Sequence, residues 1–246
     1  MTSQAALCLV VLLVLSRPDS AWAYRPFDGT DANVAEAHEV ELEVGPVGYE
    51  RQAATHFLVA PALVLNYGLH PGFEAVLEGR QHWPIHSSRE PELEDVALSL
   101  KSMLRSGSLQ GQRGASVALE TGALLPGSER RFGVHVASIF SWQWPALVLH
   151  LNLGNDLLTS VHYTATSSAI VEGPFGWPVR PVGELLLARD FGEGSLSHGL
   201  TRSALVGAIA TWSDTWVFDV AYRHALVDGR GEDEVRLGFT WSFFVQ

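Results

Sequence analysis

The chain has 246 residues, of which 47% are apolar and only 17% are charged, against roughly 25% charged residues in average soluble domains. Acidic residues outnumber basic ones by 27 to 16, and Lys101 is the single lysine. This composition excludes a nucleic-acid-binding protein, which needs a basic surface, and a disordered chain, which lacks apolar residues. A helical membrane protein is excluded as well, because no segment provides the roughly 20 consecutive apolar residues of a spanning helix.

The first 23 residues have the pattern of an export signal. The apolar run Ala5–Leu15 is too short to span a bilayer, and the sequence AWA at 21–23 matches the small-x-small pattern of a signal-peptidase site. No Lys or Arg precedes the run, so an N-terminal membrane anchor is the alternative. We expect residues 1–23 to be cleaved and the mature chain to begin at Tyr24. Because Cys8 lies within the signal, that mature chain has no disulfide framework.

After Tyr24 the chain alternates apolar and polar residues, as β-strands do. We assign residues 24–35 to a short periplasmic segment and residues 36–246 to one β-domain. Turn signals divide this domain into twelve strand candidates, centred near residues 42, 61, 76, 98, 119, 136, 149, 164, 184, 206, 219 and 239. Their spacing fits membrane strands of roughly 9–11 residues plus connections. Ten strands also fit, since Ala204–Ala210 is apolar on both faces.

The connections between these strands alternate in length, as they do in outer-membrane barrels. We expect the longer ones outside the cell, at Gly45–Thr55, Gln81–Glu94, Asp190–Gly199 and Val227–Asp233. The shorter ones then face the periplasm, at Asn66–Gly72, Trp142–Pro145 and Thr211–Thr215, with Ser106–Gly114 and Gly173–Pro178 as exceptions.

The last hairpin is specific enough to predict a register. The dipeptide at 228–229, Asp-Gly, is a strong signal for a two-residue turn between strands. Pairing about this turn sets Val227 opposite Arg230. The same register sets Arg223 opposite Glu234, with both side chains on the polar face.

Alternation alone does not say which face is wet, because a soluble β-sandwich also alternates. Three features favour a membrane barrel: a small, polar second face, an alternating last strand (Glu234–Val245), and aromatic residues near strand ends on the apolar face. These aromatic residues are Trp142, Trp144, Trp177, Trp212, Trp216 and Trp241. The predicted fold is all-β, an antiparallel up-and-down transmembrane β-barrel of about 12 strands, with ten as the alternative.

Several stretches resemble the outer-membrane barrel "transporter" family of the putative meta-pathway of phenol degradation. They are APALVLNYGL (60–69) leading to GFEAVLEG (72–79), EDVALSLKSMLR (94–105), SVALETGALLPGS (116–128) and the terminal DVAYRHAL…DEVRLGFTWSF. The resemblance covers most of the mature chain, but Ser102-Met103 stands where the family has an aromatic residue after the lysine, and the loops are short. It implies a small outer-membrane barrel that passes small solutes, hydrophobic or aromatic compounds among them.

Two groups of residues could carry chemistry. His82 and His86 have zinc-ligand spacing on a helix, but Pro84 argues against a helix, so we expect exposed loop histidines and no metal. Ser195, Ser197 and His198 suggest a serine hydrolase, but no G-x-S-x-G motif occurs and a polar loop is the simpler interpretation. We therefore expect no catalytic residue and no cofactor.

Charged residues on the polar face are predicted to point into the barrel lumen, because Arg or Lys facing lipid at the midplane would cost roughly 2–4 kcal/mol. They are Glu74, Glu78, Arg80, Lys101, Glu120, Glu184, Asp219, Arg223, Glu234 and Arg236. They either pair across the strands and plug the barrel or line a water-filled passage. The overall excess of acid is weak evidence for cation preference.

These observations predict a barrel in the outer membrane of a Gram-negative bacterium, exported through the periplasm. The first functional hypothesis is a porin-like channel or transporter for passive passage of small solutes, without enzymatic activity. The second is a structural or lipid-binding barrel with a plugged lumen, and the third, weakest one is an outer-membrane lipid hydrolase. The expected partners are outer-membrane lipid, a small-molecule solute and, during insertion, the barrel-assembly machinery, but no nucleic acid.

Overall fold

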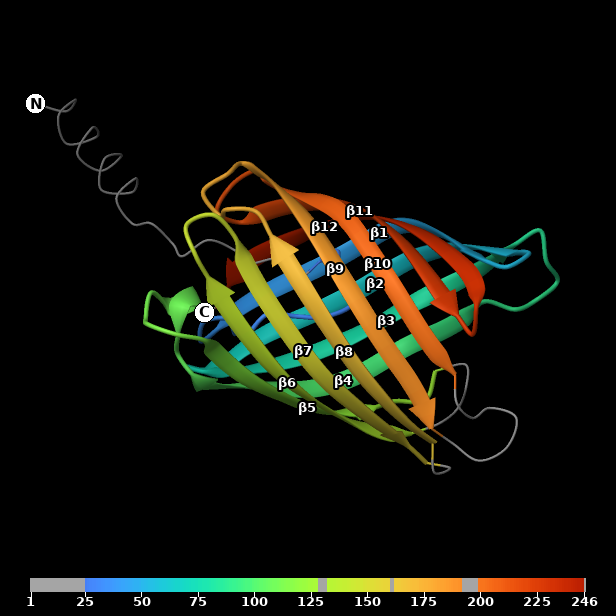
Figure 1. The fold of residues 1–246 in the computed structure, drawn as a ribbon, viewed down its shortest axis with the longest axis horizontal. Helices are drawn as coiled ribbons and strands as arrows, with labels where there is room; N and C mark the ends of the chain where they lie inside the picture. The colour runs from blue at the N-terminus through green and yellow to red at the C-terminus, as the bar shows by residue number, and fades with distance from the viewer. Residues whose placement is uncertain (1–24, 128–131, 160–161, 192–198, 246) are drawn as a thin grey trace, which may run out of the picture.

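The computed structural model describes residues 25–127, 132–159, 162–191 and 199–245. They form one closed antiparallel barrel of twelve strands (Figure 1). The strands are β1 (Glu39–Gln52), β2 (Thr55–His70), β3 (Phe73–Ile85), β4 (Glu92–Arg105), β5 (Ser116–Leu124), β6 (Gly133–Gln143), β7 (Val148–Leu158), β8 (His162–Glu172), β9 (Val179–Phe191), β10 (Leu200–Thr211), β11 (Trp216–Val227) and β12 (Arg230–Phe244), with a single 3-10 turn η1 (Ser108–Gln110). Every predicted strand centre falls within a strand, so the twelve-strand prediction is confirmed.

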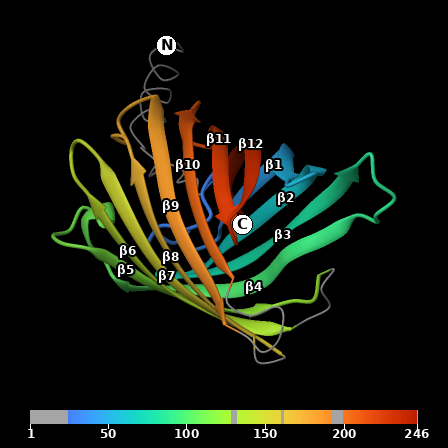
Figure 2. The same ribbon diagram turned by 45° about the vertical axis from the view of Figure 1, so that its right-hand side comes forward.

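Each strand pairs with its neighbours in the sequence, and β1 closes the ring by pairing with β12. That last ladder runs from Glu39 opposite Phe244 to Gln52 opposite Glu232. Figure 2, turned by 45°, shows the strongly tilted strands around the interior. Closure leaves no sheet edge, so the backbone groups of the wall are paired within the sheet, as hydrocarbon surroundings require. We name the end with Glu39 and Phe244 the terminal rim, and the end with Gln52 and Arg230 the opposite rim.

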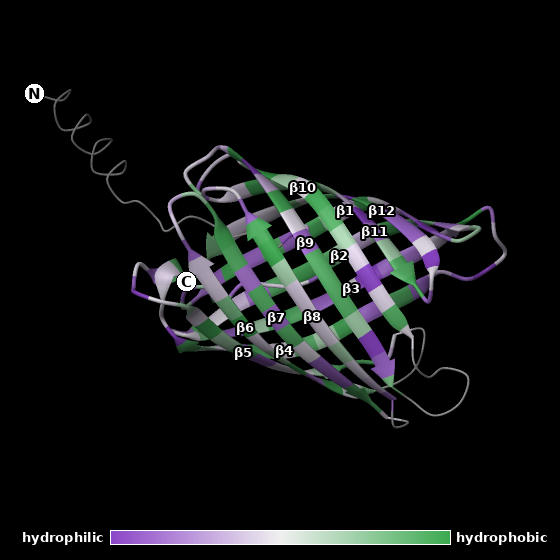
Figure 3. Cartoon of the chain, viewed as in Figure 1, coloured by the Kyte–Doolittle hydropathy of each residue, from purple (hydrophilic) through white to green (hydrophobic). Residues whose placement is uncertain are grey.

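The two faces of the sheet are inverted relative to a soluble protein. The largest fully buried side chains include Lys101, His82, His150, Glu43 and Glu74, whereas leucine, valine and aromatic side chains dominate the exposed set. Figure 3 shows the resulting alternation of hydrophobic and hydrophilic residues along the strands. None of the described residues forms a helix long and apolar enough to cross a membrane. The barrel thus presents an apolar exterior and a polar interior.

The six tryptophans of the predicted girdle all lie at or near the terminal rim, because each belongs to the end of a strand or to a connection on that side. Trp212 is 81% exposed, and Trp216 stacks on Trp241 with ring centroids 5.6 Å apart. Indole rings are amphipathic and favour the boundary between lipid and water. Their position therefore marks one edge of the apolar band.

The predicted register of the last hairpin is confirmed: Val227 pairs with Arg230, and Arg223 with Glu234. The turn residues Asp228 and Gly229 have φ of 50° and 80°, the left-handed values that a two-residue hairpin requires.

The long connection predicted for Gly45–Thr55 is wrong. β1 continues to Gln52, and only residues 53–54 link it to β2. The Gly-Pro dipeptide at 45–46 lies instead in a β-bulge between Val44 and Val47, where proline does not interrupt the ladder. The connection predicted for Gln81–Glu94 is likewise shorter, since β3 extends to Ile85 and β4 begins at Glu92.

The inverted pattern makes a prediction for Leu185, a β9 side chain that is 66% exposed on the outside. We expect Leu185→Arg to lower the free energy of unfolding in lipid vesicles by roughly 2–4 kcal/mol near the midplane, because the guanidinium would face hydrocarbon. Urea titration of the refolded protein measures this loss, with Leu185→Met as the control. Equal stability of the two variants would contradict a lipid-facing position.

Candidate functional site

The structure places all ten predicted lumen residues on the inner wall. Glu74, Glu184, Asp219, Arg223 and Arg236 contact the N-terminal segment inside the barrel. Glu78, Arg80, Lys101, Glu120 and Glu234 line the lumen cavity. They come from β3, β4, β5, β9, β11 and β12, which are half of the twelve strands of the wall.

Residues 25–38 also lie inside the barrel. Residues 24–35 are predicted to form a short periplasmic segment, and the described part of them contacts side chains of the inner wall. The segment, drawn in blue in Figures 1 and 2, has no regular secondary structure. It passes along the wall from β11 and β9 past β7, β6 and β3 to β2, and then continues as β1. We name residues 25–38 the inner loop.

Side chains of the barrel wall form hydrogen bonds with six backbone amides and two backbone carbonyls of the inner loop. Glu184 accepts hydrogen bonds from the amides of Asp28 and Gly29 at 2.8 and 2.9 Å, and Glu74 accepts one from Ala35 at 2.5 Å. Further bonds join Arg25 N to Glu43, Thr30 N and O to Asn152, Ala32 N to Ser141, and Arg236 to Pro26 O. Because a buried amide without a partner is costly, these acceptors hold the inner loop against the wall.

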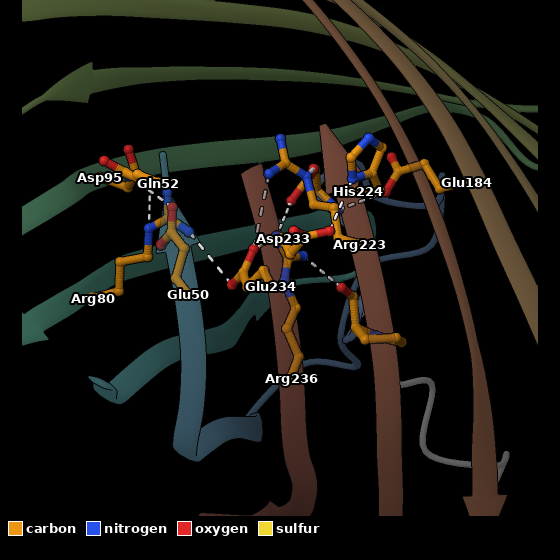
Figure 4. A network of polar contacts seen from close by, with 12 residues as sticks. Glu50, Gln52, Arg80, Asp95, Glu184, Arg223, His224, Asp233, Glu234 and Arg236 are labelled. Carbon is orange, nitrogen blue, oxygen red and sulfur yellow. Dashed lines mark hydrogen bonds and ion pairs between the residues drawn. The ribbon is translucent and has the colours of Figure 1, made fainter. Parts of the chain in front are cut away.

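Asp28 is the electrostatic centre of the inner loop. Its carboxylate accepts a hydrogen bond from Arg223 Nε at 2.8 Å and one from Arg236 Nη2 at 2.6 Å. Arg236, labelled in Figure 4 together with Arg223 and Glu234, also donates to Glu234 at 2.7 Å. Desolvation inside the barrel favours the protonated acid, but the two guanidinium groups outweigh it and hold the pKa of Asp28 well below its usual range. Asp28 is therefore an anion bound between two arginines of neighbouring strands.

Ion pairs extend this network on both sides of Asp28. Toward the opposite rim, Arg80 lies 3.9 Å from Glu234 and 2.6 Å from Asp95. Across the lumen, the buried Lys101 Nζ lies 3.8 Å from Asp31 of the inner loop and 3.9 Å from Glu74. Charged side chains buried this deeply are stable only when they are paired. The inner loop thus supplies counter-ions for the wall.

Apolar and small residues complete the fit. Phe27 packs against Val182, Ile209 and Val217, and Ala32 packs with Ala118 and Ile139.

Two lumen-facing glycines leave room for the inner loop. A Cβ at Gly68 would collide with the backbone of Glu36, and a Cβ at Gly45 would lie 2.7 Å from the Arg25 guanidinium. The wall is therefore shaped for this segment.

A cavity of about 440 Å³ remains in the lumen. Its lining includes Asp28 and Thr30 of the inner loop and, toward the opposite rim, Arg80, His135 and Asp156. Eight carboxylates of the described residues line it (Asp28, Glu43, Glu74, Glu78, Asp95, Glu120, Asp156, Glu234), against four cations (Arg25, Arg80, Lys101, Arg236). The lumen thus consists of an acidic cavity adjoining a region that the inner loop occupies.

The candidate zinc ligands do not form a metal site. His82 is buried in β3 between Glu50 and Glu94, each 3.0 Å away, so the expectation of an exposed loop histidine is wrong for it. Pro84 is accommodated within the strand. His86 lies exposed in the following turn, and the described residues contain no group of three metal-ligating side chains.

The hydrolase candidates Ser195, Ser197 and His198 lie outside the described residues. The lumen does contain a hydrogen-bonded chain of Ser141, His150 and Glu172, with distances of 2.7 and 3.1 Å. The Ser141 hydroxyl also accepts the amide of Ala32, and Glu172 pairs with Arg180. These bonds give the chain a structural role in holding the inner loop.

We expect Asp28 and Arg236 to be coupled in stability, since each is the other's counter-ion. A double-mutant cycle with Asp28→Asn and Arg236→Met, measured by urea unfolding in vesicles, should give a coupling free energy of about 1–3 kcal/mol. The same cycle between Asp28 and Arg189, which has no ion pair with Asp28, is the control. Additive effects in the first cycle would contradict the pairing.

No protein-family model matches the sequence, and no curated protein matches it. Solved structures do match, at identities that show the fold alone. An outer membrane channel from Pseudomonas putida F1 has a TM-score of 0.71 and 10% identity, over 88% of this chain and 100% of that one. The NanC porin has a TM-score of 0.57 and 10% identity (82% and 98% covered), and the KdgM porin 0.53 and 15% (82% and 99%). The likeness to the phenol-degradation family is not confirmed, whereas the chain shares the barrel fold of these outer-membrane channels.

Proposed function

We propose that the chain is an outer-membrane channel for passive passage of small polar or charged solutes. The observation that carries this proposal is the acidic, 440 Å³ cavity enclosed by a barrel whose outside is apolar. A barrel that served only as a scaffold would have no need of an interior lined with charge around a space that water can fill. The three fold relatives described above, a channel and two porins, agree with this function.

The same proposal assigns the chain a location in the cell and an orientation in the membrane. The apolar exterior and the tryptophans at the terminal rim suit an outer membrane, which the exported chain reaches through the periplasm. β1 begins and β12 ends at the terminal rim, and we place this end of the barrel on the periplasmic side, where the mature chain is predicted to start; the cavity then faces outward and the inner loop lies toward the periplasm. Connection lengths add nothing to this assignment, because they range from 2 to 10 residues at the terminal rim and from 2 to 8 residues at the opposite rim. Outer-membrane lipid and, during insertion, the barrel-assembly machinery are then its partners.

The lining argues for polar rather than hydrophobic solutes. Apolar side chains cover the outside. Valine and leucine side chains also line the cavity, but it presents carboxylates and guanidinium groups as well, and these would have to be desolvated against a hydrophobic solute. Hydrophobic or aromatic compounds, the solutes implied by the family resemblance, gain no support from this wall.

A plugged structural barrel is the second candidate, and one observation favours it: the inner loop occupies the lumen near the terminal rim. Conductance separates the two functions.

We expect the protein to produce discrete conductance steps in a planar bilayer, because water and ions can enter a charged lumen. The measurement uses the exported chain, with detergent from a mock purification as the control. Folded protein that inserts into the bilayer but gives no conductance steps would contradict the channel function and favour the plugged barrel.

The excess of carboxylates predicts cation preference. Glu120 lines the cavity, and none of the ion pairs within 4.0 Å between described residues includes it. We expect Glu120→Gln to lower the cation-to-anion permeability ratio, obtained from the reversal potential in a salt gradient, without changing the fold. The lipid-facing Leu119→Gln is the matched control, and an unchanged ratio in Glu120→Gln would contradict a role for Glu120 in the ion path.

A further inference from the structure

We infer that the terminal-rim half of the lumen is a binding groove for an extended peptide, that the inner loop is its tethered occupant, and that departure of the inner loop opens the channel toward the periplasm. The inferred opening of the channel rests on the proposed channel function, whereas the inferred peptide-binding groove does not depend on it.

The barrel is complete without the inner loop. All twelve ladders are formed between strands, and residues 25–37 contribute to none of them. The inner loop is held through wall side chains, chiefly the carboxylates of Glu43, Glu74 and Glu184. Water can solvate these groups when the inner loop leaves, whereas an exposed strand edge in lipid has no substitute partner. The inner loop can therefore detach without unfolding the wall.

The wall matches the inner loop in backbone, charge and shape. Glu184 accepts hydrogen bonds from two successive amides, those of Asp28 and Gly29. Asn152 accepts a hydrogen bond from the Thr30 amide and donates one to the Thr30 carbonyl. Hydrogen bonds to successive main-chain groups are the usual way in which a protein binds an extended peptide. Asp28 fills a site between two arginines, and Phe27 fills an apolar site between β9, β10 and β11. Backbone, charge and shape are all matched, as in a peptide-binding groove.

The inner loop is tethered to the barrel at His38. His38, with φ of 68°, forms the bend between the inner loop and β1, and its amide donates to Gly68 O at 2.7 Å. The inner loop enters β1 at the rim assigned to the periplasm. A swing about this bend would move the inner loop out of the lumen on that side only. The tether keeps its local concentration high, on the order of millimolar or more, so the groove refills after each release.

Cysteine labelling tests the groove directly. Ala32 is fully buried against Ala118 and Ile139, so a thiol at position 32 reacts with a membrane-impermeant maleimide only when the inner loop is out of its groove. With Cys8→Ser, Ala32→Cys carries a single thiol whether or not the signal is removed. The labelling rate therefore reports the detached fraction.

Gly68→Val is the displacing variant, because its side chain would stand where the Glu36 backbone lies. We expect it to raise the labelling rate of Ala32→Cys by at least about tenfold, as a matching rise in the open population would. Gly183→Val, which faces outward and meets nothing closer than Leu205 O at 3.5 Å, is the matched control and should leave the rate unchanged. An unchanged rate in Gly68→Val would overturn the inference.

Asp28→Lys serves as a second displacing variant, in case Gly68→Val does not fold. It places a cation between Arg223 and Arg236 and alters no strand residue. We expect the same increase in labelling, and fast labelling in the unmodified background would overturn the inference because the groove would then be empty.

Conductance of the same variants separates the inference from the proposed function. We expect larger single-channel steps in Gly68→Val and Asp28→Lys than in Gly183→Val. Faster labelling with unchanged conductance steps would contradict the inference that departure of the inner loop opens the channel. Faster labelling with no current in any protein would overturn the channel and leave the groove standing.

Discussion

The pairing of β1 with β12 is the constraint on which the rest of the structure depends. It closes the sheet, so that every strand has two neighbours and each alternating side chain has a defined side, apolar outside and polar inside. It also sets where the preceding residues start. Because β1 begins at the terminal rim, residues 25–38 can extend beyond that rim or enter the polar interior, whose side chains form hydrogen bonds with their backbone, whereas the apolar outside offers them no partner.

Charge matching follows from that closure. A wall that turns all its charges inward buries them, and buried charges need partners. Some partners lie on neighbouring strands, as Glu172 and Arg180 do, but others come from the inner loop. Asp28 forms ion pairs with Arg223 and Arg236, Asp31 with Lys101, and Arg25 with Asp219. The wall and the inner loop are thus parts of one electrostatic design.

The lumen consequently has two parts with different consequences for transport. The acidic cavity suits the passage of small polar solutes, while the inner loop narrows the lumen beside it. A fixed inner loop would make the barrel a plugged one, and a releasable inner loop would make it a gated channel. The two functional hypotheses therefore differ in one physical quantity, the free energy that holds residues 25–38 to the wall.

Alternation of side chains by itself determined the strands, the inward direction of the ten charged residues, and, through the Asp-Gly turn at 228–229, the pairing of Arg223 with Glu234. These features depend on neighbours in sequence, where a period of two and a tight turn leave little choice. Only the tertiary structure decided the position of residues 25–38, because an irregular segment has no period and many of its partners lie 18 to 212 residues away. The burial of His82 and the bulge at Gly45-Pro46 were missed for the same reason: proline signals a break locally, while the closed ladder around it keeps the strand intact.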